Sequence, residues 1–273
     1  GVLRVAAPLG DGSASLTAMG YDGRWTSTDQ VPQRALDSGL IGRWGTLDAS
    51  AGGRSERYSL SADVDVPLGG GDFTSTAYWF RYRLDLFSNF TYFLADPVNG
   101  DQFEQLDRRD VFGWHGEWSR GTQWQGRPVR NALGFELRRD RIEPVGLYAT
   151  LERERLATVR EDDVVEDSAG LWVSNEVRWS PTLRSMLGLR YDRYRFDVDS
   201  SVAGNSGRES AGIWSPKATL VFGPWQDTEY FVNAGYGFHS NDARGVTIRV
   251  DPVTGEPVDP ATPLVRSRGA ELG

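Results

Sequence analysis

Apolar and polar side chains alternate one by one along much of this chain. The segment 58–66 is an example, with Tyr58, Leu60 and Val64 on one side of the pattern and Ser61 and Asp63 on the other. Successive side chains of a β-strand point to opposite faces, so this period of two predicts a strand with one apolar and one polar face. Further alternating segments follow at 74–86, 112–118, 130–138, 171–179, 183–191, 213–222 and 228–239. We therefore expect an all-β chain of about eleven strands.

The lengths of the connections between these segments also alternate. Short turns are expected at 8–12, 67–72, 120–124, 180–182 and 223–227. Long polar segments lie between the turns, at about 21–55, 88–106, 142–165, 199–209 and 241–262. Transmembrane β-barrels have short periplasmic turns at one end and longer extracellular loops at the other. The pattern therefore predicts an antiparallel up-and-down transmembrane β-barrel whose strands pair with their sequence neighbours.

The composition is compatible with this fold. Hydrophobic residues make up 39% of the chain and charged residues 25%, and no stretch approaches the roughly 18 apolar residues of a membrane helix. Alternate residues of a barrel face a wet lumen, so a polar average does not exclude a barrel. Aromatic residues make up 12% of the chain, which fits aromatic girdles at the two membrane interfaces. A soluble carbohydrate-binding β protein is the weaker alternative, and partition of the chain into detergent would separate the two.

Several function classes lack support in the sequence. The formal net charge is −8 and Lys217 is the only lysine, which argues against nucleic-acid binding. With no cysteine, and only His115 and His239 as histidines, the chain has no motif of a hydrolase, metalloprotease or nucleotide-binding enzyme. We expect no enzyme activity, no cofactor and no metal. The loop tips at 96–101 and 251–256 carry the Asp, Pro and Gly of tight turns, and a calcium site there is the alternative.

The alternation also predicts which side chains face lipid and which face the lumen. Those expected on the outer face are Tyr58, Leu60, Val64, Phe80, Tyr82, Leu133, Phe135, Leu187 and Leu189. The polar side chains expected on the lumen face are Arg81, Arg83, Glu117, Glu136, Arg138, Glu176, Arg178 and Arg190. A change of phase is expected near Tyr194, after which Phe196 and Val198 continue the apolar positions. The lumen side chains would form a mixed-charge wall that binds an anionic or polyhydroxyl ligand or contacts another domain.

The last clear strand ends in a cluster of polar residues. Counted up from the turn at 223–227, His239 lies about 28 Å above the lower rim, at about 3.3 Å per residue and a tilt near 45°. This height is close to the thickness of the hydrocarbon layer. We therefore expect His239, Asn241, Asp242 and Arg244 at the extracellular mouth, as candidate substrate-binding residues. The alternative is that the Asn and Asp side chains cap the turn into the following loop.

One segment resembles a signature of a subgroup of TonB-dependent receptors. It is the run GYGFHSNDARG at 235–245, which in that subgroup marks a strand-to-loop junction late in the barrel. Three further segments are similar to barrel segments of the same group: 21–26 with 28–32, 86–93, and 263–273. Together these segments extend over nearly the whole chain.

The resemblance implies a 22-stranded outer-membrane barrel of a Gram-negative bacterium, of which residues 1–273 would be a part. It also implies an N-terminal plug domain, which we do not find in this chain, and energy supplied through TonB. The whole protein would import a scarce solute such as a ferric siderophore, cobalamin or a glycan. Its partners would be outer-membrane lipid, TonB and the small-molecule substrate. The alternative is an unplugged porin or an outer-membrane β-barrel enzyme.

Overall fold

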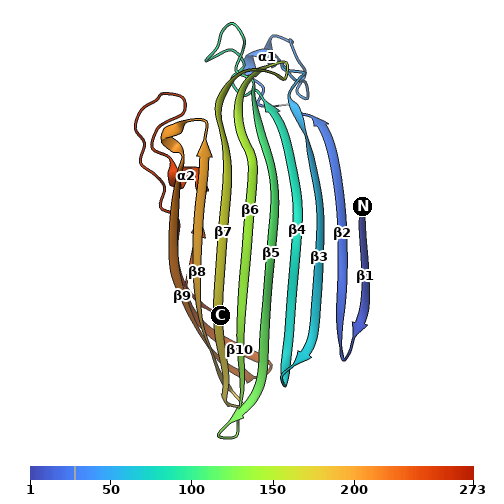
Figure 1. Ribbon diagram of the computed structural model, residues 1–273, viewed down its shortest axis with the longest axis vertical. Coiled ribbons are helices and arrows are strands. Elements are labelled where there is room, and N and C mark those ends of the chain that lie inside the picture. Colours follow the sequence, from blue (N-terminus) through green and yellow to red (C-terminus); the bar gives the residue numbers. More distant parts are fainter. Residues whose placement is uncertain (28) are drawn as a thin grey trace.

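The computed structural model describes residues 1–27 and 29–273 and consists of one sheet of 11 strands (Figure 1). Thr28, which belongs to one of the segments that carry the resemblance, lies outside the described residues. No helix in the described part of the chain is long and apolar enough to cross a membrane. The strands are β1 (Val2–Leu9), β2 (Gly12–Thr26), β3 (Gly52–Leu68), β4 (Gly71–Ser88), β5 (Phe103–Trp124), β6 (Arg127–Leu151), β7 (Glu154–Ser180), β8 (Leu183–Ser200), β9 (Gly207–Trp225), β10 (Thr228–Ser240) and β11 (Leu264–Leu272).

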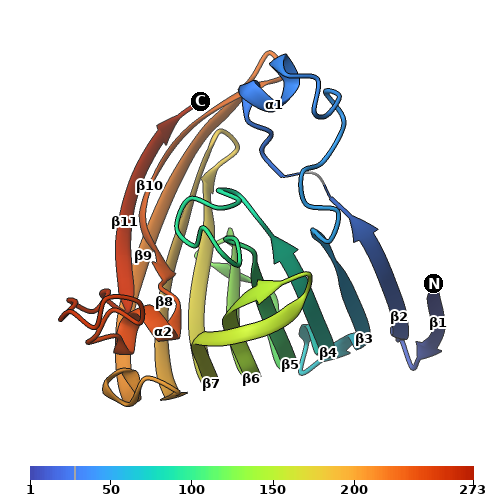
Figure 2. The same cartoon turned by 90° about the horizontal axis from the view of Figure 1, so that it is seen from above.

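Each strand pairs antiparallel with its neighbours in sequence, from β1 at one edge to β11 at the other. Seen from above, the strands follow an arc with β1 and β11 at its two ends (Figure 2). The only helical segments among the described residues are α1 (Gln33–Asp37), α2 (Ala243–Thr247) and the 3₁₀ turn Ala203–Asn205. The predicted all-β meander and its number of strands are confirmed.

Tight turns join the strands at one end of the sheet and longer connections lie at the other (Figure 1). In the β3–β4 turn, Gly69 and Gly70 have φ values of 60° and 75°. Both values lie in the left-handed region, where a side chain would clash with the backbone, so glycine is the residue that fits. The long connections are 27–51, 89–102, 201–206 and 241–263.

The prediction of a long loop at 142–165 is wrong. This segment is the upper part of β6 and β7, which are 25 and 27 residues long and are joined by a turn at Glu152 and Arg153. The β6–β7 register shifts between Ile142 and Val145 and twice more nearer the turn. A β-bulge inserts an extra residue and so reverses the inside–outside alternation beyond it. The pattern therefore looks irregular in sequence although the ladder of hydrogen bonds continues.

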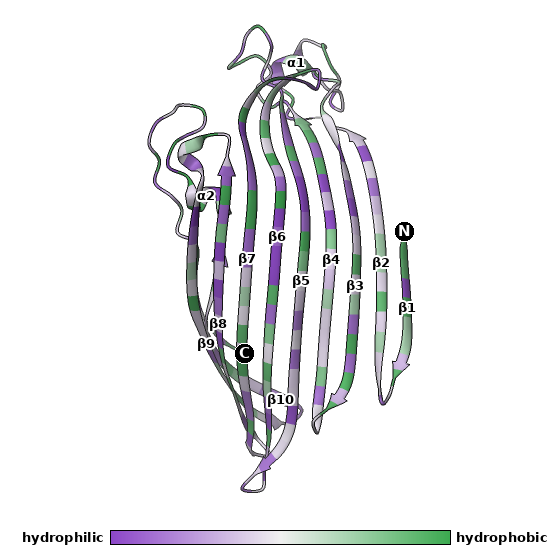
Figure 3. Cartoon of the chain, in the orientation of Figure 1, coloured by the Kyte–Doolittle hydropathy of each residue, from purple (hydrophilic) through white to green (hydrophobic). Residues whose placement is uncertain are grey.

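The register assigns every strand residue to one of two faces. One paired row joins Val64, Ser75, Gly116, Phe135, Leu171, Tyr191 and Trp214. A row on the opposite face joins Asp63, Thr76, His115, Glu136, Gly170 and Asp192. Hydrophobic and hydrophilic residues alternate accordingly along the strands (Figure 3). Because the first face is apolar and the second polar, we call them the outer face and the inner face.

Aromatic pairs mark two heights of the outer face. Near the tight turns, Trp124 packs edge-on against Trp179 with ring centroids 6.2 Å apart. Higher up, Tyr191 and Trp214 pack at 4.7 Å. Between them lies an apolar band, which we define as the outer-face residues of β5–β8 within 112–118, 133–137, 169–173 and 187–191. Aromatic belts of this kind flank the hydrocarbon layer in transmembrane barrels. Seven side chains expected outside do lie on the outer face: Tyr58, Leu60, Val64, Leu133, Phe135, Leu187 and Leu189.

The prediction of which β4 side chains face outward and which face inward is wrong. Arg81 pairs with Tyr58 in the β3–β4 register, so Arg81 and Arg83 lie on the outer face, and Phe80 and Tyr82 lie on the inner face. Arg81 stands at the top of the apolar band, where its Nε is 3.1 Å from Asp110 Oδ1. Outer-face residues above the band lie outside the hydrocarbon layer of a transmembrane barrel, where a charged side chain costs little.

On β8 too, the outer face becomes charged above the apolar band. The change of phase predicted near Tyr194 is not observed. Tyr194, Phe196 and Val198 pair with Ser168, Glu166 and Val164 and stay on the inner face. Their outer-face neighbours are Arg193, Arg195 and Asp197. The alternation of β8 is regular throughout. Above the apolar band its inner face carries the apolar side chains and its outer face carries the charged ones.

Candidate functional site

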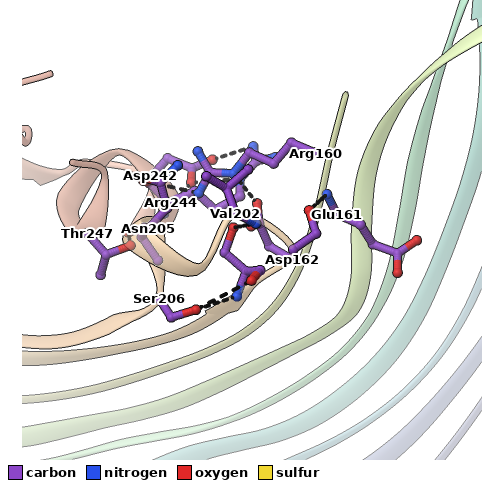
Figure 4. Close-up of polar contacts among 12 residues, drawn as sticks. Arg160, Glu161, Asp162, Val202, Asn205, Ser206, Asp242, Arg244 and Thr247 are labelled. Atoms are coloured by element: carbon purple, nitrogen blue, oxygen red, sulfur yellow. Dashed lines mark hydrogen bonds and ion pairs between the residues drawn. The ribbon is translucent and has the colours of Figure 1, made fainter. Parts of the chain in front are cut away.

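The segment that follows β10 folds onto the inner face of the sheet. β10 pairs with β9 as far as Gly235 and then leaves it. Above this point the ring of Phe238 packs edge-on against Tyr194 at 5.9 Å, and Tyr194 belongs to the inner face of β8. The end of β10 and α2 therefore lie inside the curve of the strands (Figure 4).

Apolar contacts hold α2 in this position. Ala243 and Val246, which are 4% and 2% exposed, form a core cluster with four side chains of the inner wall: Val145, Val164, Phe196 and Val198. These side chains explain why the upper inner face of β6–β8 is apolar, since they are covered by α2 and not by lipid. Burial of this kind contributes about 25 cal/mol per Å² of apolar surface.

Asp242 and Arg244 form a bidentate ion pair at the start of α2. Arg244 Nε lies 3.0 Å from Asp242 Oδ1 and Arg244 Nη2 lies 2.8 Å from Asp242 Oδ2. Asp242 Oδ1 also accepts a hydrogen bond from the Arg244 backbone N–H at 2.8 Å, which makes Asp242 the N-cap of α2. Burial opposes ionisation of Asp242, but the contacts with Arg244 hold the pKa of that carboxyl below its usual range. The pair is therefore ionised and fixes the start of α2.

A second ion pair lies beside the start of α2 (Figure 4). Arg160 Nε is 2.6 Å from Asp162 Oδ2, and the two side chains are 11% and 0% exposed. Arg160 Nη2 also donates to the Arg244 carbonyl oxygen at 3.5 Å. The Arg160 N–H is not aligned with Asp162, so neither carboxylate oxygen of Asp162 has a hydrogen-bond donor among the described residues. A buried pair of this kind adds little stability overall, but loss of one partner leaves an uncompensated charge.

Two small cavities separate the end of β10 and α2 from the inner wall. The larger, of about 210 Å³, is bounded by Asn241, Asp242 and Arg244 on one side and by Arg109, Asp140 and Glu166 on the other. The second, of about 150 Å³, has Arg138, Asp140, Glu166, Ser168, Tyr194 and Ser240 in its wall. The two cavities share Asp140, Glu166 and Ser240.

Asp140 and Glu166 differ in their partners. Arg138 Nε and Nη2 donate to the two oxygens of Asp140 at 2.6 and 2.7 Å. Glu166 has no hydrogen bond or ion pair of its own within the described chain. Burial, followed by the charge of Asp140, raises the pKa of Glu166 to about 7. The cavity wall therefore holds a carboxyl that changes its charge near neutral pH.

The four candidate residues have different surroundings. Asp242 and Arg244 contact each other, as described above. Asn241 Nδ2 donates to the Thr262 carbonyl at 2.7 Å and so closes the base of the loop before β11. His239 alternates with Phe238, which packs against the wall, so His239 points the opposite way and is exposed. It makes no hydrogen bond with any described residue, and the structure does not join it to the other three.

Asn205 is fully buried, and no pattern in the sequence predicts a role for it. Its Oδ1 accepts hydrogen bonds from the backbone N–H groups of Arg249 and Val250 at 2.8 and 2.9 Å. Its Nδ2 donates to the Val250 carbonyl at 2.9 Å. Asn205 thus fixes the segment after α2 to the β8–β9 connection. An asparagine in a polar loop carries no sequence signal for such a role.

The lower inner wall contains most of the expected polar side chains. The register places Glu117, Glu136, Arg138, Glu176, Arg178 and Arg190 on the inner face. Arg190 Nη2 lies 2.8 Å from Glu136 Oε2 and 2.6 Å from Asp192 Oδ1. Trp172 Nε1 donates to Glu117 Oε2 at 3.1 Å. Arg190 is therefore paired with two carboxylates of the inner face.

A third polar cluster joins the long connections above β2–β7. Asp48 Oδ2 accepts hydrogen bonds from Asn89 Nδ2 at 2.9 Å and from Gln102 Nε2 at 2.8 Å. Burial works against ionisation of Asp48, yet hydrogen bonds from Ser50, Asn89 and Gln102 leave its pKa lowered. Gln102 Oε1 in turn accepts from Thr150 Oγ1 at 3.0 Å, which connects this cluster to the β6–β7 turn. The contacts join the β2–β3 and β4–β5 connections to the end of β6.

The two similar loop tips have the hydrogen bonds of turns. Asp96 Oδ1 accepts from the backbone N–H groups of Val98 and Asn99 at 2.9 Å, and Asp251 Oδ1 accepts from those of Val253 and Thr254 at 2.8 Å. These contacts lower the pKa of both aspartates. Among residues 1–27 and 29–273, no group of three or more His, Cys, Asp or Glu side chains is placed to hold a metal ion.

Known proteins resemble this chain in fold. The family described as TonB dependent receptor-like, beta-barrel, matches residues 7–273. The ferric preacinetobactin receptor BauA of Acinetobacter baumannii matches 99% of the chain at a TM-score of 0.73 and 8% identity. The alcaligin receptor FauA of Bordetella pertussis matches all of it at 0.67 and 14%, and the ferric citrate transporter FecA matches 87% at 0.69 and 11%.

The chain spans 43% of BauA, 39% of FauA and 36% of FecA. No curated protein sequence gives a significant match. Proteins of the matched family are transporters of the Gram-negative outer membrane and not enzymes. The match over residues 7–273, together with the antiparallel meander and its apolar outer band, identifies this chain as a β-barrel segment of the TonB-dependent receptor family.

Proposed function

We propose that the chain is about half of the barrel of a TonB-dependent receptor that imports a ferric siderophore. The observation that carries this proposal is the position of α2, which lies on the inner wall above a cavity bounded by Arg109, Asp140, Glu166 and the Asp242–Arg244 pair. A charged cavity on the upper inner face of the curved sheet is a suitable place to retain a polar solute before it passes downward.

The completed protein would be a closed barrel with a plug. Within the described chain, β1 pairs only with β2 and β11 only with β10. Unpaired backbone N–H and C=O groups are costly in a membrane, so a spanning sheet must close on itself. We infer that further strands complete a barrel of 22, that an N-terminal plug fills it, and that TonB contacts the plug region.

The class of solute is supported by the chemistry of the inner wall. Arg190 lies over the Trp172 ring at 5.1 Å and Arg57 over Phe80 at 4.3 Å, and all four side chains are on the inner face. Ferric siderophores combine anionic oxygens with apolar or aromatic parts, which such pairs can contact together. BauA, FauA and FecA are receptors or transporters of ferric complexes or siderophores. Cobalamin and glycans remain the other candidate classes.

In the mechanism that we propose, the solute first meets His239 and the long connections at the extracellular mouth. Arg244 and Asp242 then contact it beside the cavity, while Asn241 keeps the loop closed at its base. Passage through the barrel follows when TonB rearranges the plug. In this scheme α2 narrows the upper lumen, and its contacts with the wall determine how far the solute can descend unaided.

Whole-cell uptake tests this proposal. Cells that express the full-length receptor would be given ⁵⁵Fe bound to citrate, to a catecholate or to a hydroxamate, with labelled cyanocobalamin and a labelled maltooligosaccharide as the other classes. We expect one iron complex to be taken up in tonB⁺ cells and not in tonB-deleted cells. Uptake of cobalamin or glycan instead would overturn the substrate class. Equal uptake in both strains would favour the unplugged porin.

Point variants test the site itself. Arg244→Ala and His239→Ala should lower the uptake of that iron complex, whereas Asp227→Asn, in the tight β9–β10 turn at the opposite end of the sheet, should leave it unchanged. Normal uptake by both alanine variants at normal surface abundance would remove these residues from the site.

A further inference from the structure

A hollow lies on the outer face of the sheet, at the top of the apolar band. Its volume is about 640 Å³. Side chains of two adjacent outer-face rows form its walls: Ala77, Trp114, Leu137, Ala169 and Arg193 in the lower row, and Phe112, Arg139, Asp167 and Arg195 in the upper row. We call this hollow the outer groove. It is separate from the inner cavities, because the sheet lies between them.

The lower half of the outer groove is apolar. Phe112, Trp114 and Leu137 are 51%, 48% and 45% exposed, and no other element of the described chain covers them. Ala169 lies between Leu137 and Arg193 in the same row. Because its side chain is only a methyl group, the space above it is empty and forms the hollow. A strip of this shape fits an extended hydrocarbon chain.

The upper half of the outer groove has a net positive charge. Arg139 is neutralised by Asp167, with Nε and Oδ1 2.9 Å apart. Arg193 and Arg195 are exposed, and neither forms an ion pair with a described carboxylate. Arg193 makes only a 3.3 Å hydrogen bond to Ser210 Oγ. Because they are two residues apart on one strand, both guanidinium groups lie on the same face and can reach one anion.

The height of these arginines matches the outer edge of the hydrocarbon layer. Arg193 is the first charged residue on the outer face of β8 above the tight turn, and the outer-face residues below it are Leu183, Ser185, Leu187, Leu189 and Tyr191. From Leu183 to Arg193 the strand rises about 23 Å along the membrane normal, at about 3.3 Å per residue and a tilt near 45°. The arginines are therefore at headgroup level, with Trp214 and Tyr191 just below.

We propose that the outer groove binds an anionic lipid of the outer leaflet. Arg193 and Arg195 hold the phosphate of its headgroup, and one acyl chain lies over Ala169, beside Leu137 and Trp114. Phosphate is the group that paired arginines recognise best, through several charge-assisted hydrogen bonds. A soluble anion would gain nothing from the apolar half, which faces hydrocarbon, so the geometry favours a lipid. This site requires the outer-membrane position of the barrel but no particular transported solute.

The test uses the full-length receptor in a neutral detergent, titrated with short-chain phosphatidic acid and followed by native mass spectrometry. Arg193→Ala/Arg195→Ala should weaken binding about 30-fold, since each basic residue near a lipid surface contributes about a factor of five. Ala169→Leu fills the space above residue 169 in the outer groove and should also weaken binding, although it changes no charge. Arg24→Ala/Arg83→Ala is the matched control, because it removes two outer-face arginines far from the groove and should leave binding unchanged.

Two further probes separate the sources of the anion. Inorganic phosphate has no acyl chain and should bind at least about 30-fold more weakly than phosphatidic acid, because buried CH₂ groups contribute to lipid binding. A short-chain diacylglycerol has no phosphate and should not distinguish the wild type from the double variant. Equal binding of inorganic phosphate, or a control variant as weak as Arg193→Ala/Arg195→Ala, would overturn the proposal. Iron uptake by the double variant should be normal. Failure of the lipid site would therefore leave the proposed transport function untouched.

Discussion

Glu166 stands directly opposite Asp140 across the β6–β7 pair, on the inner wall beneath the end of β10. Asp140 is paired with Arg138, and Glu166 is left as the carboxyl with the raised pKa. The pair lies beyond the apolar band, since the neighbouring outer-face residues are Arg139 and Asp167. The wall against which the β10–β11 segment packs therefore contains a group that is neutral below pH 7 and charged above it.

Glu166→Gln should make the receptor less sensitive to pH. Folding raises the pKa of Glu166 from 4.5 to about 7, so the folded state favours the protonated form. The stability that this gives is fully present below pH 4.5 and is lost as the pH rises through 7. Thermal unfolding of the full-length receptor in detergent should therefore show a higher Tm for the variant at pH 8 and no difference at pH 4. A variant that is less stable than the wild type at pH 8 would contradict this account.

Asp242→Ala should loosen α2, because it removes both the N-cap and the ion pair with Arg244. Loss of an N-cap costs about 1 kcal/mol. Hydrogen exchange of residues 241–263 should become faster in the full-length receptor, while exchange in β3 and β4 stays unchanged. Asp242→Asn keeps a capping oxygen and is the control, with an intermediate effect. Identical protection in all three proteins would show that α2 is held by Ala243 and Val246 alone.

Asn205→Ala should release the segment after α2 from the β8–β9 connection. The change leaves the N–H groups of Arg249 and Val250 without acceptors, and each buried unsatisfied group costs about 1–3 kcal/mol. The backbone amides of Arg249 and Val250 should lose protection against exchange. Asn205→Asp retains the acceptor oxygen and should preserve more of this protection than alanine does.

Leu189→Arg should destabilise the barrel, because Leu189 lies in the middle of the apolar band beside Val173 and Pro216. An arginine on the lipid face at mid-membrane costs about 2–4 kcal/mol. Met186→Arg, on the inner face of the same strand opposite Glu176, is the matched control and should cost little. Urea unfolding in lipid vesicles measures both. Equal losses from the two variants would contradict the assignment of the faces.

The sequence predicted the sheet well because its signal is local. Alternation fixes which residues share a face, and one-sided short turns fix antiparallel neighbours, so the meander needed no knowledge of distant contacts. The error on β4 arose because Phe80 and Arg81 were assigned as if the whole strand were surrounded by lipid. Above the apolar band the two faces exchange polarity, and a single strand does not reveal where the band ends.

The site depends on contacts that alternation cannot encode. Phe238 lies in phase with the outward residues of β10, yet it packs against Tyr194 on the inner wall after β10 separates from β9. Residues 142–165 were mistaken for a loop for a related reason, since the bulges near Ile142 and Leu147 shift the phase. The polar residues Asp242 and Arg244 were found by their chemistry, whereas Asn205 and Glu166 have roles that appear only in three dimensions.

The length of β6 and β7 has a consequence for how the receptor is seen from outside the cell. From Arg139 to Leu151 the paired strands extend about 28 Å beyond the apolar band, at about 3.3 Å per residue and a tilt near 45°. Their backbones are hydrogen-bonded to each other there, so an antibody that binds this region recognises a folded, two-stranded epitope. Antibodies raised against the folded receptor should bind this ridge on intact bacteria, and a linear peptide of residues 139–166 should compete poorly for them.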